Sequence, residues 1–186
     1  MADLPVPKDR KLFFTSSVTQ ESISTLTTSI IEINESDRLL TRLYDVYDIK
    51  YTPKPIEIYI DSYGGGVYHA LGLVSIMNAS KTPIHTYATG VAMSAAFLML
   101  IYGHKRFAHE HSTMLYHQVS SWSRGKLHDM VDDIKQSKAV QKKMETLVLD
   151  RTKIPKETLK SVYKERRDWF ITAKEALKLG IIDEII

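Results

Sequence analysis

The sequence has no cysteine among its 186 residues. This absence excludes disulfides, thiolate metal sites, iron–sulfur clusters and a cysteine nucleophile. Long hydrophobic runs are also missing: the longest apolar stretch, Val91 to Tyr102, contains Ser94 and is shorter than the roughly 20 residues that a membrane-spanning helix needs. The segment Met1 to Arg10 lacks the apolar core of a secretory signal. We therefore expect a cytoplasmic protein without a membrane segment.

An excess of charge of one sign is absent too. There are 25 Lys and Arg against 22 Asp and Glu, and the basic residues between Arg151 and Arg167 alternate with Glu157 and Glu165. A nucleic-acid binder would instead show a clustered basic face. No histidine pair has the spacing of zinc ligands, and no His-Glu-x-x-His motif occurs. The sequence predicts a globular protein that binds neither nucleic acid nor metal.

Strand and helix patterns alternate along the chain, which predicts one α/β domain over residues 1–186 with a largely parallel sheet. The expected strands are Lys11–Phe14, Ile56–Ile60, Ile84–Thr89, Arg106–Phe107, Thr113–His117 and Ile181–Ile186. The expected helices are Gln20–Ile33, Val67–Ala79, Ser94–Tyr102, Leu127–Asp150, one opened by Pro155, and Ala173–Leu179. We also expect a break at Asn34–Asp37, a helix or a surface excursion over Arg38–Tyr51, and a turn at Gly90.

A glycine-rich turn, Asp61-Ser62-Tyr63-Gly64-Gly65-Gly66, follows one predicted strand and precedes a helix. Glycines permit positive φ angles and the close approach of another group, and such a turn can aim amides at an anion. The spacing fits neither a Walker loop nor a dinucleotide fingerprint. On its own, the turn is equally consistent with a simple connection between strand and helix.

Ser94 lies in a second strand–helix junction, Gly90-Val91-Ala92-Met93-Ser94-Ala95-Ala96. We expect it at the N-cap or in the first turn of an apolar helix. The amide of Ala95 would then point out of the helix N-terminus, where negative charge is favoured. This arrangement suits a nucleophile beside its own oxyanion donor. A plain capping serine is the alternative.

Two further residues are candidates for proton chemistry. His117 ends a predicted strand, and Asp168 lies between Arg167 and the aromatic pair Trp169-Phe170. We expect Asp168 to be partly buried and to need a cationic or imidazole partner. Considered separately, each residue has a simpler explanation. His117 can be a structural histidine, and Asp168 can form a surface salt bridge with a neighbouring arginine.

The order of these motifs resembles the Clp protease proteolytic subunit (ClpP) family. The resemblance covers Lys11 to Ile186, and it is most specific in the block Arg-Asp-x-Phe-Ile-Thr-Ala-x-Glu-Ala-x-x-x-Gly-Ile-Ile-Asp from Arg167 to Asp183. It implies a crotonase-like core of ββα repeats with a projecting handle helix at about residues 127–150.

The resemblance implies a serine endopeptidase that cleaves unfolded polypeptides or peptides inside an oligomeric chamber. Ser94 is then the nucleophile, His117 the general base and Asp168 the residue that orients the histidine. The backbone amides of Gly65 and Ala95 form the oxyanion hole. Peptide cleavage of this kind needs no cofactor and no metal.

The resemblance also implies a homo-oligomer of two stacked heptameric rings, a tetradecamer, which the handle helices interlock. A hexameric AAA+ unfoldase would feed it polypeptide substrates. If residues 127–150 form the handle helix, its apolar side chains would pack against the other ring.

Several positions depart from the family pattern. Tyr63 replaces the proline after Asp-Ser, beside the expected oxyanion hole, and Val119 replaces the proline after His-Gln. In the family, a glycine-rich strand follows and binds the substrate backbone. Here the corresponding segment is Ser120-Ser121-Trp122-Ser123-Arg124-Gly125. The region before Lys11 is short, which predicts reduced axial-pore loops. Residues 37–54 look like an insertion where the ATPase-docking surface forms.

Three alternatives remain open on the sequence. One is a non-catalytic or partner-dependent ring subunit of a Clp-type protease. Another is a crotonase-fold acyl-CoA enzyme, which would not need Ser94, His117 and Asp168 together. The last is a serine–lysine protease similar to signal peptide peptidases, which would want a catalytic lysine and usually a membrane anchor.

Overall fold

The computed structural model describes residues 9–186 of the chain. The elements are, in order, β1 (Lys11–Phe14), α1 (Gln20–Asp45), β2 (Ile56–Ser62), α2 (Val67–Ala79), β3 (Ile84–Met93), α3 (Ala95–Ile101), β4 (Lys105–Ala108), β5 (Thr113–Tyr116), α4 (Leu127–Arg151), α5 (Lys156–Glu165), β6 (Trp169–Thr172), α6 (Ala173–Lys178) and β7 (Glu184–Ile185).

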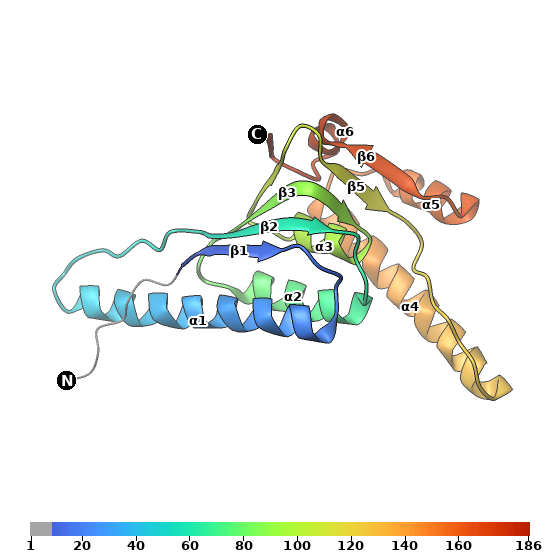
Figure 1. Cartoon of the computed structure of the whole chain (residues 1–186), viewed down its shortest axis with the longest axis horizontal. Coiled ribbons are helices and arrows are strands. Elements are labelled where there is room, and N and C mark those ends of the chain that lie inside the picture. The colour runs from blue at the N-terminus through green and yellow to red at the C-terminus, as the bar shows by residue number, and fades with distance from the viewer. Residues whose placement is uncertain (1–8) are drawn as a thin grey trace.

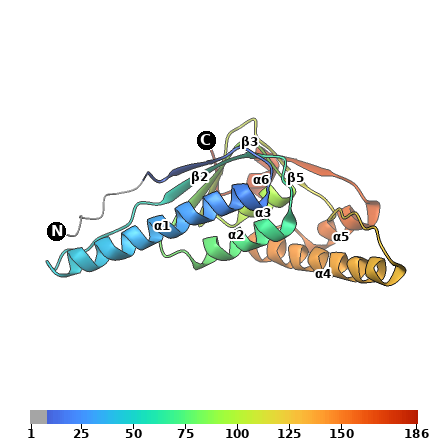
Figure 2. The ribbon, with the colours of Figure 1, turned by 60° about the horizontal axis from the view of Figure 1, so that its bottom comes forward.

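A seven-stranded, largely parallel sheet forms the centre of the fold, which confirms the predicted α/β class. Strands β1-β2-β3-β4-β7 run parallel in that order. Strand β5 joins the far end of β3, also in parallel, and β6 pairs antiparallel with β5. Helices α1, α2 and α3 lie along one face of the sheet (Figures 1 and 2).

The main hydrophobic core lies between the sheet and these helices. Ile56, Ile58 and Ile60 alternate along β2 and are buried on the helix side. Helix α3 is buried on every side, as its uniformly apolar sequence predicts. On the opposite face, a row of aromatic rings crosses the strands, with stacked neighbours at centroid distances of 5.2, 4.7 and 4.6 Å: Phe13, Tyr59, Tyr87 and Phe107.

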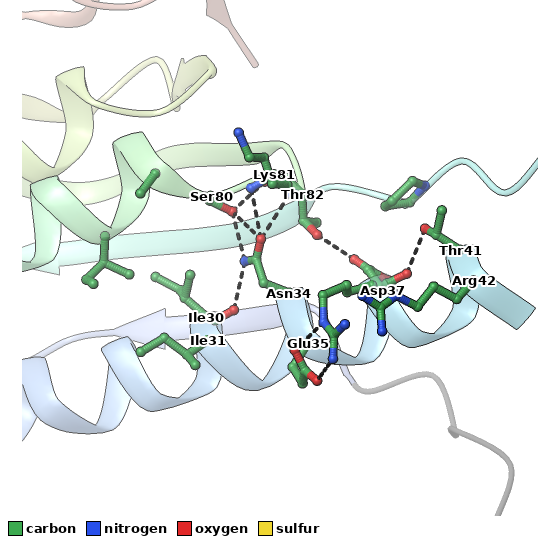
Figure 3. Close-up of a pocket in the computed structure, with 14 residues that line it drawn as sticks. Ile30, Ile31, Asn34, Glu35, Asp37, Thr41, Arg42, Ser80, Lys81 and Thr82 are labelled. Atoms are coloured by element: carbon green, nitrogen blue, oxygen red, sulfur yellow. Dashed lines mark hydrogen bonds and ion pairs between the residues drawn. The ribbon is translucent and has the colours of Figure 1, made fainter.

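Helix α1 continues through Asn34–Asp37, so the predicted break there is wrong. Two of the polar side chains that suggested a break, Asn34 and Asp37, have partners on other segments (Figure 3). The Asn34 side chain bonds Ser80 and accepts from the amides of Lys81 and Thr82. Because these bonds satisfy polar groups on the buried side, the helix needs no interruption.

Asp37 is the most buried of these polar residues, with 4% of its side chain exposed. It accepts hydrogen bonds from Arg10 (2.8 Å), Tyr51 (2.9 Å) and Thr82. Burial disfavours its charge, but these donors outweigh the burial, and the pKa of Asp37 lies below its usual value. The Asp37 carboxylate therefore connects the second half of α1 to three other segments through hydrogen bonds.

Strand β3 also continues past Gly90, where we predicted a turn. The strand changes neighbour there: its first half pairs with β4 and Val91–Met93 pairs with β5. The side chain of Asp61 packs against Gly90, where a Cβ would come within 2.5 Å of its carboxylate, and accepts a hydrogen bond from the Val91 amide (2.9 Å). The glycine thus marks a close contact within a continuous strand.

The remaining elements follow the sequence with small differences. The last strand is only Glu184–Ile185, shorter than predicted, and the Asp183 side chain before it bonds the Arg106 amide and guanidinium. Helix α4 projects away from the sheet (Figure 1) and exposes Leu127, Met130 and Ile134 along its first half. Within residues 9–186, no helix is both long and apolar enough to cross a bilayer.

Candidate active site

Ser94 occupies a strained turn between β3 and α3. Its φ angle of +54° is unusual for a residue other than glycine. The turn is held by hydrogen bonds from the Ser94 amide to the Leu115 carbonyl (3.0 Å) and from the Phe97 amide to the Ser94 carbonyl (3.1 Å). The Ser94 side chain makes no capping bond to the helix. The plain capping role is therefore wrong, and the hydroxyl is available for other contacts.

The glycine-rich turn packs directly against the Ser94 turn. At Gly64, with φ of +97°, an added Cβ would lie 2.6 Å from the Met93 carbonyl oxygen and 2.9 Å from the Ser94 Cβ. At Gly65, with φ of +146°, it would lie 2.5 Å from the Val18 carbonyl oxygen. Both positions need glycine for conformation and for space.

Two residues with candidate oxyanion amides, Gly65 and Ala95, line the cavity beside Ser94. The bridge to Val18 uses the Gly64 carbonyl and the Gly66 amide (both 2.8 Å), which leaves the Gly65 amide outside the bridge. Ala95 is the first residue of α3, where amides have no intrahelical acceptor. Gly65 and Ala95 line the same cavity as Ser94. Donors so placed can stabilise a developing oxyanion.

His117 completes this arrangement from the end of β5. Its Nε2 lies 2.8 Å from the Ser94 Oγ, within hydrogen-bonding distance of a general base. The shared cavity has a volume of about 270 Å³ and is lined by Gly65, Gly66, Val67, Tyr68, Ser94, Ala95, Tyr116, His117, Val119, Ser120 and Met144. The structure thus brings together a hydroxyl, an imidazole and two residues with candidate oxyanion amides from three segments.

Asp168 lies on the other side of His117, but more loosely. Its Oδ1 is 3.7 Å from the His117 Nδ1, beyond the range of a hydrogen bond, and its side chain is 60% exposed. The expected partial burial is wrong. Asp168 directly precedes β6, which among the described strands pairs only with β5, and Phe170, two residues further on, is itself 57% exposed.

Sequence reasoning missed the contribution of α4 to this site. Met144 lines the cavity, and Gln136 donates to the hydroxyl of Tyr68 in its wall (2.7 Å). Buried Gln141 bonds the residues on both sides of the His117–Gln118 pair. Helical spacing does place Gln141 and Met144 on one face, but nothing in the sequence shows that this face meets His117.

Residues 9–186 contain no group of three His, Asp or Glu side chains placed to hold a metal ion. A larger cavity of about 830 Å³ lies between α1, α2 and the segment before β3 (Figure 3). It contains none of the residues predicted to act in catalysis.

Comparison with known proteins identifies the family. The Clp protease family matches residues 7–186 of the sequence. This chain belongs to the Clp protease family. The match explains why the motifs around Ser94, His117 and Asp168 occur in this order.

Several curated Clp proteins are similar to the chain, and each is named "ATP-dependent Clp protease proteolytic subunit". The Deinococcus radiodurans protein is 35% identical over 75% of this chain and 68% of its own length. The Bacteroides fragilis protein is 32% identical over 72% of the chain and 64% of its own length. The Bacteroides thetaiotaomicron protein is 28% identical over 96% and 74%. The chain thus spans a little under two thirds of the Bacteroides fragilis relative.

The departures from the Clp protease pattern have different structural outcomes. Tyr63 is 77% exposed and, in the described part of the chain, does not line the cavity. The 37–54 segment forms the end of α1 and the return to β2. Most of the short region before Lys11 falls in residues 1–8, which lie outside the described residues.

Proposed function

We propose that the chain is a serine-type endopeptidase of the Clp protease family that cleaves unfolded polypeptides or peptides. The observation that carries the proposal is the 2.8 Å contact between Ser94 Oγ and His117 Nε2 in a cavity that the amides of Gly65 and Ala95 also line. The names of the relatives support the proteolytic assignment.

The proposed reaction follows the chemistry of a serine triad. His117 Nε2 takes the Ser94 proton as Oγ attacks the scissile carbonyl carbon, and the amides of Gly65 and Ala95 stabilise the resulting oxyanion. His117 then returns the proton to the leaving amine, which leaves an acyl group on Ser94. Water, deprotonated by the same imidazole, releases the acid. Asp168 holds the imidazole orientation and stabilises its cation once it closes on Nδ1.

We further propose that the protein works as a cytoplasmic homo-oligomer of two stacked heptameric rings, with α4 as the handle between them and a single peptidase domain per chain. The projecting first half of α4 and its exposed Leu127, Met130 and Ile134 support this role. A hexameric AAA+ unfoldase is the proposed partner, because the relatives are named as ATP-dependent.

The loose contact of Asp168 favours a second form of this function, in which the triad closes only in the assembled or partner-bound particle. An ion pair at 3.7 Å with an exposed carboxylate holds an imidazole weakly. This form predicts slow hydrolysis by isolated chains and faster hydrolysis by assembled rings.

The test is hydrolysis of a panel of short fluorogenic peptides by the purified protein, with Ser94→Ala alongside and the particle mass recorded. Activity that disappears in Ser94→Ala supports the peptidase. A well-formed ring without activity under any partner condition contradicts it and indicates a non-catalytic subunit. Turnover of an acyl-CoA thioester that survives Ser94→Ala would instead indicate a crotonase-type enzyme.

A further inference from the structure

Gln141 is a polar side chain buried in the face of α4 that meets the His117 segment. Only 6% of its surface is exposed, whereas its neighbours Lys142 and Lys143 are exposed. Buried polar side chains are retained where their hydrogen bonds are satisfied. Every bond of the Gln141 amide goes to a residue near the active site or on the next turn of α4.

The Gln141 amide bonds the chain on both sides of the His117–Gln118 pair. Its Oε1 accepts from the Val119 amide (2.8 Å), and its Nε2 donates to the Tyr116 hydroxyl (3.3 Å). Burial raises the pKa of Tyr116 to about 12, so this hydroxyl stays neutral. Tyr116, which precedes His117, and Val119, which follows Gln118, are thus both hydrogen-bonded to the side chain of Gln141.

Glu145 fixes the orientation of this amide. Gln141 Nε2 also donates to Glu145 Oε1 (2.9 Å), one turn further along α4. A carboxylate only accepts and a backbone N–H only donates, so the amide nitrogen must face Glu145 and the amide oxygen must face Val119. The two partners leave the amide a single satisfied orientation.

We propose that Gln141 is a positioning residue for His117, through which helix α4 holds the general base against Ser94. This role rests on the proposed peptidase function. It arises in this chain because residue 119 is a valine: its amide needs an acceptor, and Gln141 supplies one. A shift of the His117 segment by about 1 Å would lengthen the 2.8 Å contact with Ser94, and displacements of that size can cost about 10²-fold in rate.

The first test compares Gln141→Met with the parent protein. Methionine keeps the length and burial of the side chain but loses the acceptor. We expect kcat to fall by about 10- to 100-fold with little change in KM, because substrate contacts remain and only the base is displaced. Lys142→Met, on the exposed face of the same helix, is the matched control and should keep the parent kcat.

A double-mutant cycle separates positioning from a general loss of packing. Val119→Pro removes the amide N–H that donates to Gln141 Oε1. In the proline background, Gln141→Met should therefore lower kcat by a several-fold smaller factor than in the parent. An equal loss in both backgrounds, or an unchanged kcat in Gln141→Met, overturns the proposal.

Peptide-level hydrogen exchange over residues 117–121 gives a readout that does not depend on activity. Gln141→Met should exchange faster there than the parent, with an unchanged particle mass; unchanged exchange overturns the positioning role even if Val119→Pro fails to assemble. Failure of the peptidase proposal looks different. In that case the parent itself neither hydrolyses peptides nor reacts at Ser94, whatever the exchange result.

Discussion

At the scale of single residues, the site depends on two neighbouring backbone turns that hold each other in unusual conformations. Ser94 has a φ angle of +54°, and Gly64 packs against its Cβ and against the preceding carbonyl. Gly65 in turn packs against Val18. The proposed nucleophile and one proposed oxyanion donor are therefore placed by close backbone contacts, which side chains larger than hydrogen would disrupt.

Gly65→Ala tests the oxyanion hole at this scale. The added methyl would meet the Val18 carbonyl at 2.5 Å and the φ of +146° is strained for alanine, so the Gly65 amide must move. Loss of one oxyanion donor costs about 10²- to 10³-fold in kcat. We expect a loss in that range with the assembly intact, measured on a fluorogenic peptide. Gly72→Ala, on α2 with open space around its Cα, is the control.

The sequence predicted the positions of the proposed site residues in the fold better than their environment. Ser94 at a helix start and His117 at a strand end follow from local patterns. The exposure of Asp168 does not, because it depends on whether another segment covers the edge next to β6. The hydrogen bond between Gln141 and Val119 was missed because it depends on where α4 crosses the His117 segment.

At the scale of elements, the length of α1 is the feature that local sequence describes least well. Asn34 and Asp37 favour a helix end by propensity, yet both lie inside a helix of 26 residues. Their side chains bond the 80–82 segment and Arg10, contacts that are distant in sequence. Tertiary hydrogen bonds thus overrode the local preference. The same reason explains Gly90, where Asp61 packs against a continuous strand.

Asp37→Asn tests whether that buried carboxylate holds the α1 extension. The substitution keeps the shape of the side chain but removes the negative charge of the carboxylate that accepts hydrogen bonds from Arg10 and Thr82. Hydrogen bonds to a charged group contribute about 2 kcal/mol, so we expect the free energy of unfolding to fall by about that amount in urea titrations. Glu35→Gln, which breaks an exposed pair with Arg38 on the same helix, should leave the midpoint unchanged. Equal midpoints for the two variants contradict the assignment.

At the scale of the whole molecule, α4 connects the active site to the proposed assembly. Its second half packs Val140, Met144 and Val148 into the core, and its first half projects with exposed apolar side chains. The sequence predicted a projecting helix over Leu127–Asp150 but not this division, because local sequence does not show which half of the helix meets the core. It also predicted the order of strands and helices and the parallel sheet, because both follow from alternating patterns along the chain.

Ile134→Asp tests the proposed handle. Ile134 is 54% exposed and lies in the first half of α4, the helix that projects from the sheet in Figure 1. A charge there would be buried without a partner between two rings, so we expect the particle mass to fall by half in sedimentation velocity experiments. An unchanged mass would show that the rings do not meet through this face.

The stability of the fold should depend on pH through Asp37 and Asp183. Burial raises the pKa of each carboxyl, but hydrogen bonds from Arg10 and from Arg106 outweigh it and hold both pKa values below the usual range. As the pH falls, the carboxyls of the unfolded chain bind protons near pH 3.9, at a higher pH than the same carboxyls in the folded protein. The stabilisation is therefore present above about pH 4 and is lost as the pH falls through the folded pKa values.

Urea midpoints at pH 7, 5, 4 and 3 measure this loss. We expect the parent to lose stability steeply below pH 4 and the double variant Asp37→Asn, Asp183→Asn to show a shallower dependence. The same slope in both proteins would assign the acid sensitivity to other groups.

The most direct test of the central claim is covalent labelling of Ser94. The purified protein would be treated with a fluorophosphonate, and the adduct mapped by mass spectrometry, with His117→Ala treated in parallel. The account predicts one adduct per chain at Ser94, formed rapidly in the parent and at least about 10²-fold more slowly without the imidazole. No adduct at Ser94 in assembled particles, or equal rates in the two proteins, would contradict it.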